Sequence, residues 1–234
     1  MLDAEIAKDA VDANPTLPQR IERRAARDER HVLAGVREFR SEVTTDTARA
    51  NDRDSHRADY DRDMFRLETE RLIIRPWEAG DRDAFVGFTR DPEVMRYVHG
   101  GVPYSEDEIA EFLGRQARQL AEFDVCMGAM VEKETSRVVG VCGIQPLGTT
   151  GDYEIGWWLA RDRWGRGYAT EAGRAAMEHV LAMRPRVVAI IDPGNEPSKR
   201  VVARLGMHYE GRFTGTQLGH RKPDIVVDVF ARER

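Results

Sequence analysis

Residues 164–172, W-G-R-G-Y-A-T-E-A, join a predicted strand to a predicted helix through a glycine-rich turn, and this unit is the most informative part of the sequence for the fold. The strand is expected at 152–159, and apolar residues at helical spacing predict the helix at 170–183. The two glycines let backbone N–H groups turn inward together, the arginine between them adds a cation, and the helix N-terminus adds about half a positive charge. This combination predicts an anion site suited to a pyrophosphate, and the alternative interpretation is a plain glycine-rich turn.

Working outward from this unit, short apolar runs bounded by turn residues indicate further strands and helices. Strands are predicted at 71–75, 125–131, 137–144, 187–191, 207–213 and 225–230. Helices are predicted at 81–89, where Asp81 would be the cap, and at 105–123, where Ser105 and Glu108 form a capping box. A further helix is predicted at about 197–205, and a short helical turn after residue 91. Because hairpins and helical crossovers are mixed, we expect an α+β (α/β) fold with a mixed central β-sheet of about six to seven strands flanked by helices.

Composition and charge exclude several classes of protein. The 234 residues carry 36 Lys and Arg against 41 Asp and Glu, so the net charge of −5 disfavours a nonspecific nucleic-acid or membrane-surface binder. Two cysteines, Cys126 and Cys142, are too few for a disulfide framework or a thiolate zinc cage, and the six histidines form no H-x-x-x-H pair. We therefore expect reduced, buried thiols and no metal.

Residues 1–63 differ from the remainder in composition, since they are highly charged and contain very few aromatic side chains. Val32, Val36, Phe39 and Val43 follow helical spacing, which suggests an amphipathic helix that either docks onto a partner or is simply solvated. The segment 50–63 reads as a flexible linker. Met64 resembles a natural chain start, so residues 64–234 are expected to form the whole functional domain, with residues 1–63 as an N-terminal extension.

The chain start lacks the apolar core of a signal peptide, and no apolar run approaches the ~20 residues that span a bilayer. We therefore expect a cytoplasmic protein without a membrane partner.

Five segments occur in order within residues 64–234: T-E-R-L-I-I-R-P-W (69–77), D-P-E-V-M-R-Y-V (91–98), E-I-G-W-W-L (154–159), W-G-R-G-Y-A-T-E-A (164–172) and N-E-P-S-K-R-V (195–201), the last followed by L-G-M (205–207). Together they resemble the GNAT N-acetyltransferase superfamily, and specifically its ribosomal-protein N-acetyltransferase-like (RimJ/RimL) branch. The resemblance covers essentially all of the predicted domain, whereas the first 63 residues have no counterpart in it.

The resemblance implies a GNAT fold and transfer of an acetyl or other short acyl group, such as succinyl, from acyl-CoA to a primary amine. Acetyl-CoA would be the co-substrate, with no metal. We expect the acceptor to be the N-terminal α-amine of a protein or peptide, and the alternatives are a small amine or an aminoglycoside. A non-catalytic acyl-CoA-binding or scaffold protein is a hypothesis of another class. Neither nucleic acid nor membrane is expected as a partner, and the chain would act as a monomer or homodimer.

The resemblance also assigns residues to roles. Glu154 would take a proton from the amine; the alternative is that it merely orients the substrate. Ser198 would donate a proton to the leaving sulfur; the alternative is that its hydroxyl merely begins a helix. A backbone N–H near Trp158 or Leu159 would stabilise the developing oxyanion, and Asn195 would bind the pantetheine arm. The expected acyl-CoA contacts are Trp158, Leu159, Ala160, Trp164, Gly165, Arg166, Gly167, Tyr168, Ala169, Thr170, Asn195 and Ser198. The acceptor side is expected to involve Tyr97, His99 and Glu154, together with residues 100–101 and 220–221.

Two positions depart from the pattern of the superfamily. Trp164 stands where the phosphate-binding loop usually opens with Gln or Arg, which matters little because that loop binds mainly through backbone N–H groups. Val202 stands where many members carry a tyrosine that protonates the departing thiolate. Ser198 is the substitute candidate for that role.

Overall fold

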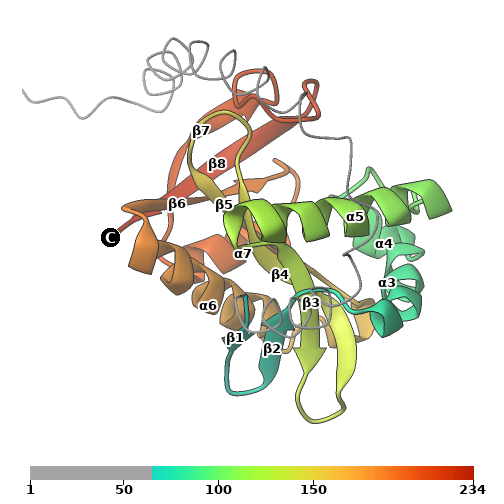
Figure 1. The fold of residues 1–234 in the computed structure, drawn as a ribbon. Coiled ribbons are helices and arrows are strands. Elements are labelled where there is room, and N and C mark those ends of the chain that lie inside the picture. Colours follow the sequence, from blue (N-terminus) through green and yellow to red (C-terminus); the bar gives the residue numbers. More distant parts are fainter. Residues whose placement is uncertain (1–64) are drawn as a thin grey trace, which may run out of the picture. The chain divides into compact units, whose positions relative to one another are not determined.

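The computed structural model describes residues 65–234. The helix, linker and chain start predicted for residues 1–64 lie outside this part of the chain. Within it, one eight-stranded sheet is flanked by helices on both faces (Figure 1).

The strands follow the chain order β1 to β5, after which the order changes to β6, β8 and β7. Their bounds are Leu67–Glu68 (β1), Leu72–Arg75 (β2), Met127–Glu132 (β3), Arg137–Pro146 (β4), Tyr153–Leu159 (β5), Arg186–Ile191 (β6), His208–Thr214 (β7) and Val226–Glu233 (β8). All neighbours are antiparallel except β5 and β6. Seven of these strands were predicted. The eighth, β1, is a two-residue edge strand that is too short to show a pattern in the sequence.

Helices form where the sequence supplies apolar spacing and, in most cases, a capping residue. Their bounds are Ala79–Asp81 (η1), Arg82–Thr89 (α3), Pro92–Met95 (α4), Glu106–Phe123 (α5), Arg161–Arg163 (η2), Tyr168–Met183 (α6) and Glu196–Arg204 (α7). The predicted capping box opens α5, where Ser105 Oγ accepts from the N–H of Glu108 and the Glu108 carboxylate accepts from the N–H of Ser105. Asp81 differs from expectation, because its carboxylate pairs with Arg75 and makes no side-chain cap to α3.

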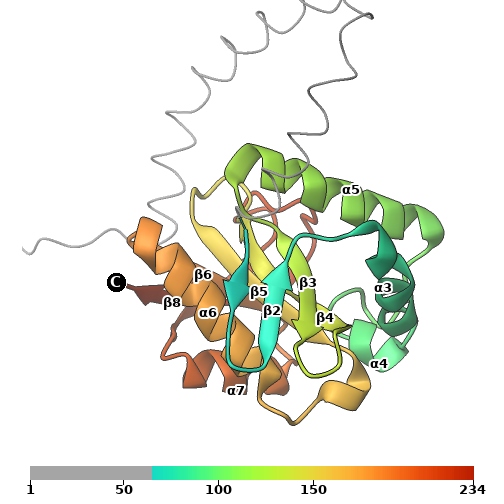
Figure 2. The same ribbon diagram turned by 60° about the horizontal axis from the view of Figure 1, so that its bottom comes forward.

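The helices cover the two faces of the sheet in separate groups. One hydrophobic cluster joins α3, α4 and α5 to the sheet, with Phe85 and Phe112 stacked at its centre, 4.9 Å between ring centroids. The other cluster packs Ala172, Ala176 and Val180 of α6, with residues of α7, against the opposite face. Figure 2 shows α5 and α6 on different sides of the strands. Both cysteines are free and buried, as expected; Cys142 lies in β4, and Cys126 directly precedes β3.

The sheet opens between β5 and β6. The two strands are parallel and share a single paired position, Glu154 with Val188, whereas β4 and β5 stay paired along the whole length of β5. Beyond Glu154 the edge of β5 that faces β6 therefore has no ladder partner. Backbone groups on an unpaired edge are available to a ligand.

Candidate active site

A cleft of about 1550 Å³ occupies this opening. Its walls come from β5 and β6, from the loop before α6, from the start of α7, from α5 and from the segment between β7 and β8. The opening of the sheet therefore brings together residues that are far apart in the sequence.

The loop after β5 is held in a turned conformation by its own side chains and glycines. Trp164 Nε1 donates to the C=O of Leu159 at 2.9 Å, which folds the loop back onto the end of the strand. Gly165 and Gly167 have φ values of 75° and 81°, a left-handed conformation that costs other residues about 1–2 kcal/mol. The glycines at these positions are therefore required by the backbone, as the sequence predicted.

The first turn of α6 presents free amide groups to the cleft. Gly167 occupies the capping position and has no side chain to offer, and Glu171 donates the first helical bond to its C=O at 3.0 Å. The N–H groups of Tyr168, Ala169 and Thr170 consequently have no partner in the described part of the chain, and all three residues line the cleft. By contrast, side chains cap α5 and α7. Unpaired N–H groups at a helix N-terminus fit an anion such as a diphosphate.

Two residues from the start of the domain fix this loop. Arg71 Nη1 donates to the C=O of Arg166 at 3.0 Å, its Nε donates to Glu171 at 2.7 Å, and its guanidinium lies 4.7 Å from the centre of the Tyr168 ring. Glu171 also accepts from the hydroxyl of Thr69. The Tyr168 hydroxyl donates to Glu132, so this side chain points into the protein and only its backbone faces the cleft.

Glu154 lies at the point where the sheet opens, and its side chain is buried and lines the cleft. Burial raises the pKa of Glu154 to about 7, against the opposing effects of a hydrogen bond from Gln145 and the positive charge of Arg221. Gln145 Nε2 donates to Glu154 Oε2 at 3.0 Å across the β4–β5 pair. A carboxylate with this pKa can accept a proton near neutral pH.

The backbone of β5 distinguishes between the two candidate oxyanion donors. The N–H of Ala160 donates to the C=O of Val139 in β4 at 2.8 Å, and N–H groups two residues apart point to the same side of a strand. The N–H of Trp158 is therefore directed to β4, whereas that of Leu159 faces the open edge. Of the two, only Leu159 offers its amide to the cleft.

The start of α7 forms another wall. Asn195 caps this helix by accepting from the N–H of Ser198 at 3.1 Å, and both residues line the cleft. Neither the Asn195 amide nitrogen nor the Ser198 hydroxyl has a hydrogen-bond partner within residues 65–234. Val202 is fully buried, so the position that departs from the superfamily pattern does not face the cleft.

On the acceptor side, the cleft lining includes Tyr97, Glu154, His220 and Arg221 as predicted, but it does not include His99 or residues 100–101. The Nε2 of His99 lies 3.2 Å from Glu108, and its ring packs against Tyr104. His99 therefore does not line the cleft itself but contacts a residue that does. Among the predicted acyl-CoA contacts, Ala160 is outside the cleft lining, and its N–H donates to the C=O of Val139 in β4.

Sequence reasoning missed Gln145, Tyr104 and Arg115, all of which line the cleft. Gln145 reaches Glu154 only through the β4–β5 register, which local sequence patterns do not specify. Arg115 lies on the expected helix 105–123, and an arginine in a charged helix gives no signal that it faces a cleft. Tyr104 immediately precedes the predicted capping box and could have been noticed as an aromatic residue beside a loop.

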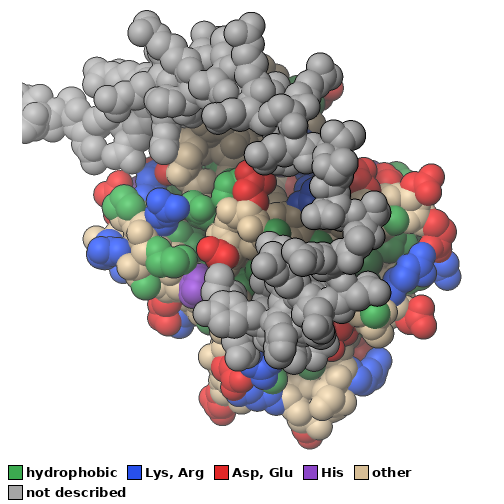
Figure 3. All heavy atoms as spheres, viewed as in Figure 1, with side chains coloured by type: hydrophobic (Ala, Val, Ile, Leu, Met, Phe, Trp, Pro, Cys, Tyr) green, Lys and Arg blue, Asp and Glu red, His purple; other side chains and the backbone are tan. Residues whose placement is uncertain are grey.

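The surface and the helices add two observations. On the face shown in Figure 3, outside the grey atoms, acidic and basic side chains are interspersed rather than gathered into a broad patch of one sign. No helix between residues 65 and 234 combines the length and apolar character needed to cross a membrane.

Comparison with known proteins identifies the domain. The family model described as an acetyltransferase (GNAT) domain matches residues 71–208. Protein YkkB of Bacillus subtilis is 34% identical over 149 residues, covering 62% of this chain and 86% of that protein. The N-acetyltransferase p20 of Bacillus licheniformis, uncharacterised beyond that name, is 31% identical over 152 residues, covering 63% and 85%.

Solved structures agree with these matches. A GNAT-family acetyltransferase from Bacillus anthracis is 26% identical with a TM-score of 0.59, and the match covers 72% of this chain and 98% of that structure. RimL, a ribosomal L7/L12 alpha-N-protein acetyltransferase solved with coenzyme A, shares the fold at 16% identity with a TM-score of 0.60, covering 72% and 98%. The chain therefore belongs to the GNAT acetyltransferase family and is a CoA-dependent N-acetyltransferase.

Proposed function

We propose that this enzyme transfers an acetyl group from acetyl-CoA to the α-amine of a peptide or protein N-terminus. The observation that carries the proposal is the placement of Glu154: a buried carboxylate with a pKa of about 7, in one cleft with the uncapped first turn of α6. The cleft volume exceeds the roughly 300–1,000 Å³ of typical small-molecule pockets, which leaves room for a peptide beside the donor.

The residues would act in sequence as follows. The amides of residues 165–170 hold the diphosphate of the donor, while Asn195 holds its pantetheine arm. Glu154 accepts a proton from the acceptor ammonium, whose pKa is about 7.7–8.0 as an α-amino group. The nitrogen then attacks the thioester carbonyl, so that a C–N bond forms and the C–S bond breaks.

The charges that develop in this step have partners in the cleft. The Leu159 N–H donates to the carbonyl oxygen as it becomes negative, and one such donor contributes about 3 kcal/mol to the transition state. Ser198 lines the cleft, and in this proposal its hydroxyl donates to the departing sulfur. The bond from Gln145 holds the Glu154 carboxylate in place throughout.

Release of free thiol from acetyl-CoA across a panel of amines tests the proposal. The panel contains short peptides with free and with blocked N-termini, polyamines and aminoglycosides, and is repeated with succinyl-CoA. Steady turnover on peptides with free N-termini, and none on the blocked ones, is expected. Turnover confined to polyamines or aminoglycosides would overturn the peptide assignment, and binding of acetyl-CoA without turnover on any amine would favour the non-catalytic alternative.

A further inference from the structure

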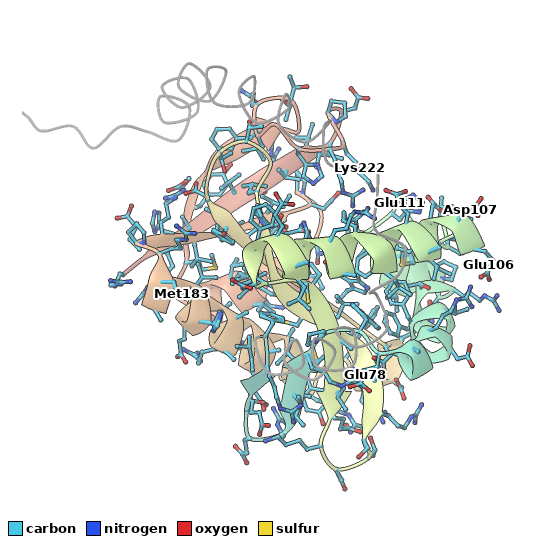
Figure 4. All side chains as sticks on the ribbon, viewed as in Figure 1. Glu78, Glu106, Asp107, Glu111, Met183 and Lys222 are labelled. Carbon is cyan, nitrogen blue, oxygen red and sulfur yellow. The ribbon has the colours of Figure 1, made fainter. Side chains whose placement is uncertain are left out.

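A group of basic side chains lies on the acceptor side of the cleft. Arg115 of α5 and Arg221 and Lys222 of the segment between β7 and β8 all line the cleft, with Tyr104 beside them. Figure 4 shows Lys222 and Glu111 on the same side of α5. Two elements that are about a hundred residues apart in sequence therefore direct positive charge at the same space.

These charges are only partly compensated within the domain. Among residues 65–234, no carboxylate lies within ion-pair distance of Arg221 or Lys222. Glu108, whose charge acts on Lys222, is engaged by Ser105 and His99. Burial, and next the neighbouring Arg221, lower the pKa of Lys222, and Glu108 offsets this only partly.

Arg115 is the most enclosed member of the group. Its side chain is 19% exposed, its guanidinium lies 5.3 Å from the centre of the Phe112 ring, and its nearest carboxylate is the exposed Glu111 at 3.7 Å. Its Nε is buried and has no hydrogen-bond partner among the described residues. Burial, and next Arg221, lower its pKa. A buried donor without a partner is costly, so such a group favours a ligand that accepts its hydrogen bond.

The position of the group separates it from the loop that we assign to the diphosphate. Arg221 is close enough to Glu154 to lower the pKa of that carboxyl group. The diphosphate loop begins only after β5 has run from Glu154 to Leu159, ~17 Å further along the strand. Arg221 therefore lies near the place where the acceptor amine meets Glu154, and Arg115 and Lys222 line the same cleft.

We propose that the acceptor carries an anionic group, a carboxylate or a phosphate, close to its amine, and that Arg115 and Arg221 bind this group while Glu154 receives the amine. The inference rests on the proposed function and specifies its substrate class. Arginine suits the role because its planar guanidinium can donate two parallel hydrogen bonds to a carboxylate or phosphate. An acceptor with both charges would be oriented before reaction, with its nitrogen at the general base.

Matched pairs of acceptors test this inference in the full-length enzyme. The first pair is a peptide with Asp and one with Asn at the second position, the second is an amino acid with its amide, and the third is phosphoethanolamine with ethanolamine. The three pairs separate an anionic group in a peptide side chain, a free carboxylate and a phosphate. In at least one pair the charged member should have a kcat/KM about tenfold above its neutral partner, the usual size of one charge-assisted contact. Arg221→Gln should reduce this ratio to near one.

Arg118→Gln is the control, because Arg118 lies on the same helix as Arg115 but does not line the cleft, and it should leave the ratio as in the wild type. The exposed position of Arg221 makes its variant suitable, and its circular dichroism spectrum should match the wild type. Two results would overturn this inference while leaving the proposed function in place. One is turnover in which no pair shows a preference for its charged member. The other is an equal loss of kcat/KM for the charged and the neutral member in Arg221→Gln. Failure to acetylate any amine would overturn the proposed function with it.

Discussion

At the scale of single residues, Glu154 combines two properties that suit a general base. It is buried enough to have a pKa of about 7, and it lies where β5 and β6 separate, so a substrate nitrogen can approach it. Burial stabilises the protonated form, the bond from Gln145 and the charge of Arg221 stabilise the ionised form, and the balance keeps both forms populated near neutral pH. The side chain can therefore take up and release a proton during each turnover.

Replacing Glu154 with Gln should lower turnover at pH 7 by about tenfold or more, because general-base catalysis typically contributes at least that factor. In the wild type, kcat/KM should fall as the pH drops below about 7, since Glu154 becomes protonated. In the variant the decline should follow the pKa of the acceptor amine alone, about 7.7–8.0. Initial rates between pH 5.5 and 9 measure both profiles. If kcat/KM of the variant still fell with an apparent pKa near 7, Glu154 would not be the base.

The same substitution should change stability in the opposite direction to activity. The folded-state pKa of Glu154, about 7, is raised above the unfolded value of about 4.3. The protonated carboxyl group therefore contributes to the free energy of unfolding below about pH 4.3, and this contribution is lost as the pH rises through about 7. Glu154→Gln, which carries no charge, should therefore be more stable than the wild type at pH 8, by up to about 3 kcal/mol. Urea denaturation at pH 8 and pH 5.5 measures the difference in the free energy of unfolding between variant and wild type, which should be smaller at pH 5.5. Equal stability of variant and wild type at both pH values would show that burial of the carboxylate does not destabilise the fold.

At the scale of elements, the site depends on the unit formed by β5, the glycine loop and α6, and local sequence was sufficient to predict this unit. Glycines at 165 and 167, an apolar strand before them and helical spacing after them are all signals carried within about thirty residues. The contacts that hold the unit come from elsewhere. Arg71 and Thr69 reach the loop from 95 or more residues away in sequence, and no local pattern indicates that distance.

Arg71→Gln tests whether this contact positions the loop. The variant loses the bond to the Arg166 carbonyl, the ion pair with Glu171 and the contact with the Tyr168 ring. The KM for acetyl-CoA should rise about five- to tenfold, which corresponds to one charge-assisted hydrogen bond, with kcat less affected. Arg66→Gln is the matched control, because Arg66 is exposed nearby and pairs only with Glu68 within the described domain. An unchanged KM in Arg71→Gln would mean that the loop holds its shape without this residue.

At the scale of the whole molecule, the decisive feature is the separation of β5 from β6, which creates the cleft. The sequence predicted seven of the eight strands, the flanking helices and the family. It did not predict which residues would face the opening, because that depends on strand register and on segments that meet only in the folded sheet. Glu154, Ser198 and the loop were predicted to act together and all line one cleft, whereas His99 and Ala160 do not line it.

The long-range packing also explains the misjudged Asp81. Its sequence position is typical of a helix cap, but in the fold Arg75 at the end of β2 lies beside it and takes both carboxylate oxygens, at 2.7 and 3.0 Å. The carboxylate also accepts from the N–H of Glu78 at 2.8 Å, so it closes the capping box of η1 and pairs with Arg75 instead of capping α3.

A crystal structure of the full-length enzyme with bound coenzyme A tests the central claim most directly. The claim is that the unpaired amides of residues 165–170 bind the diphosphate and so direct the thioester between β5 and β6. We expect diphosphate oxygens within hydrogen-bond distance of these amides and the sulfur beside Ser198. A diphosphate bound instead to Arg115, Arg221 and Lys222, at the other end of the cleft, would contradict the account.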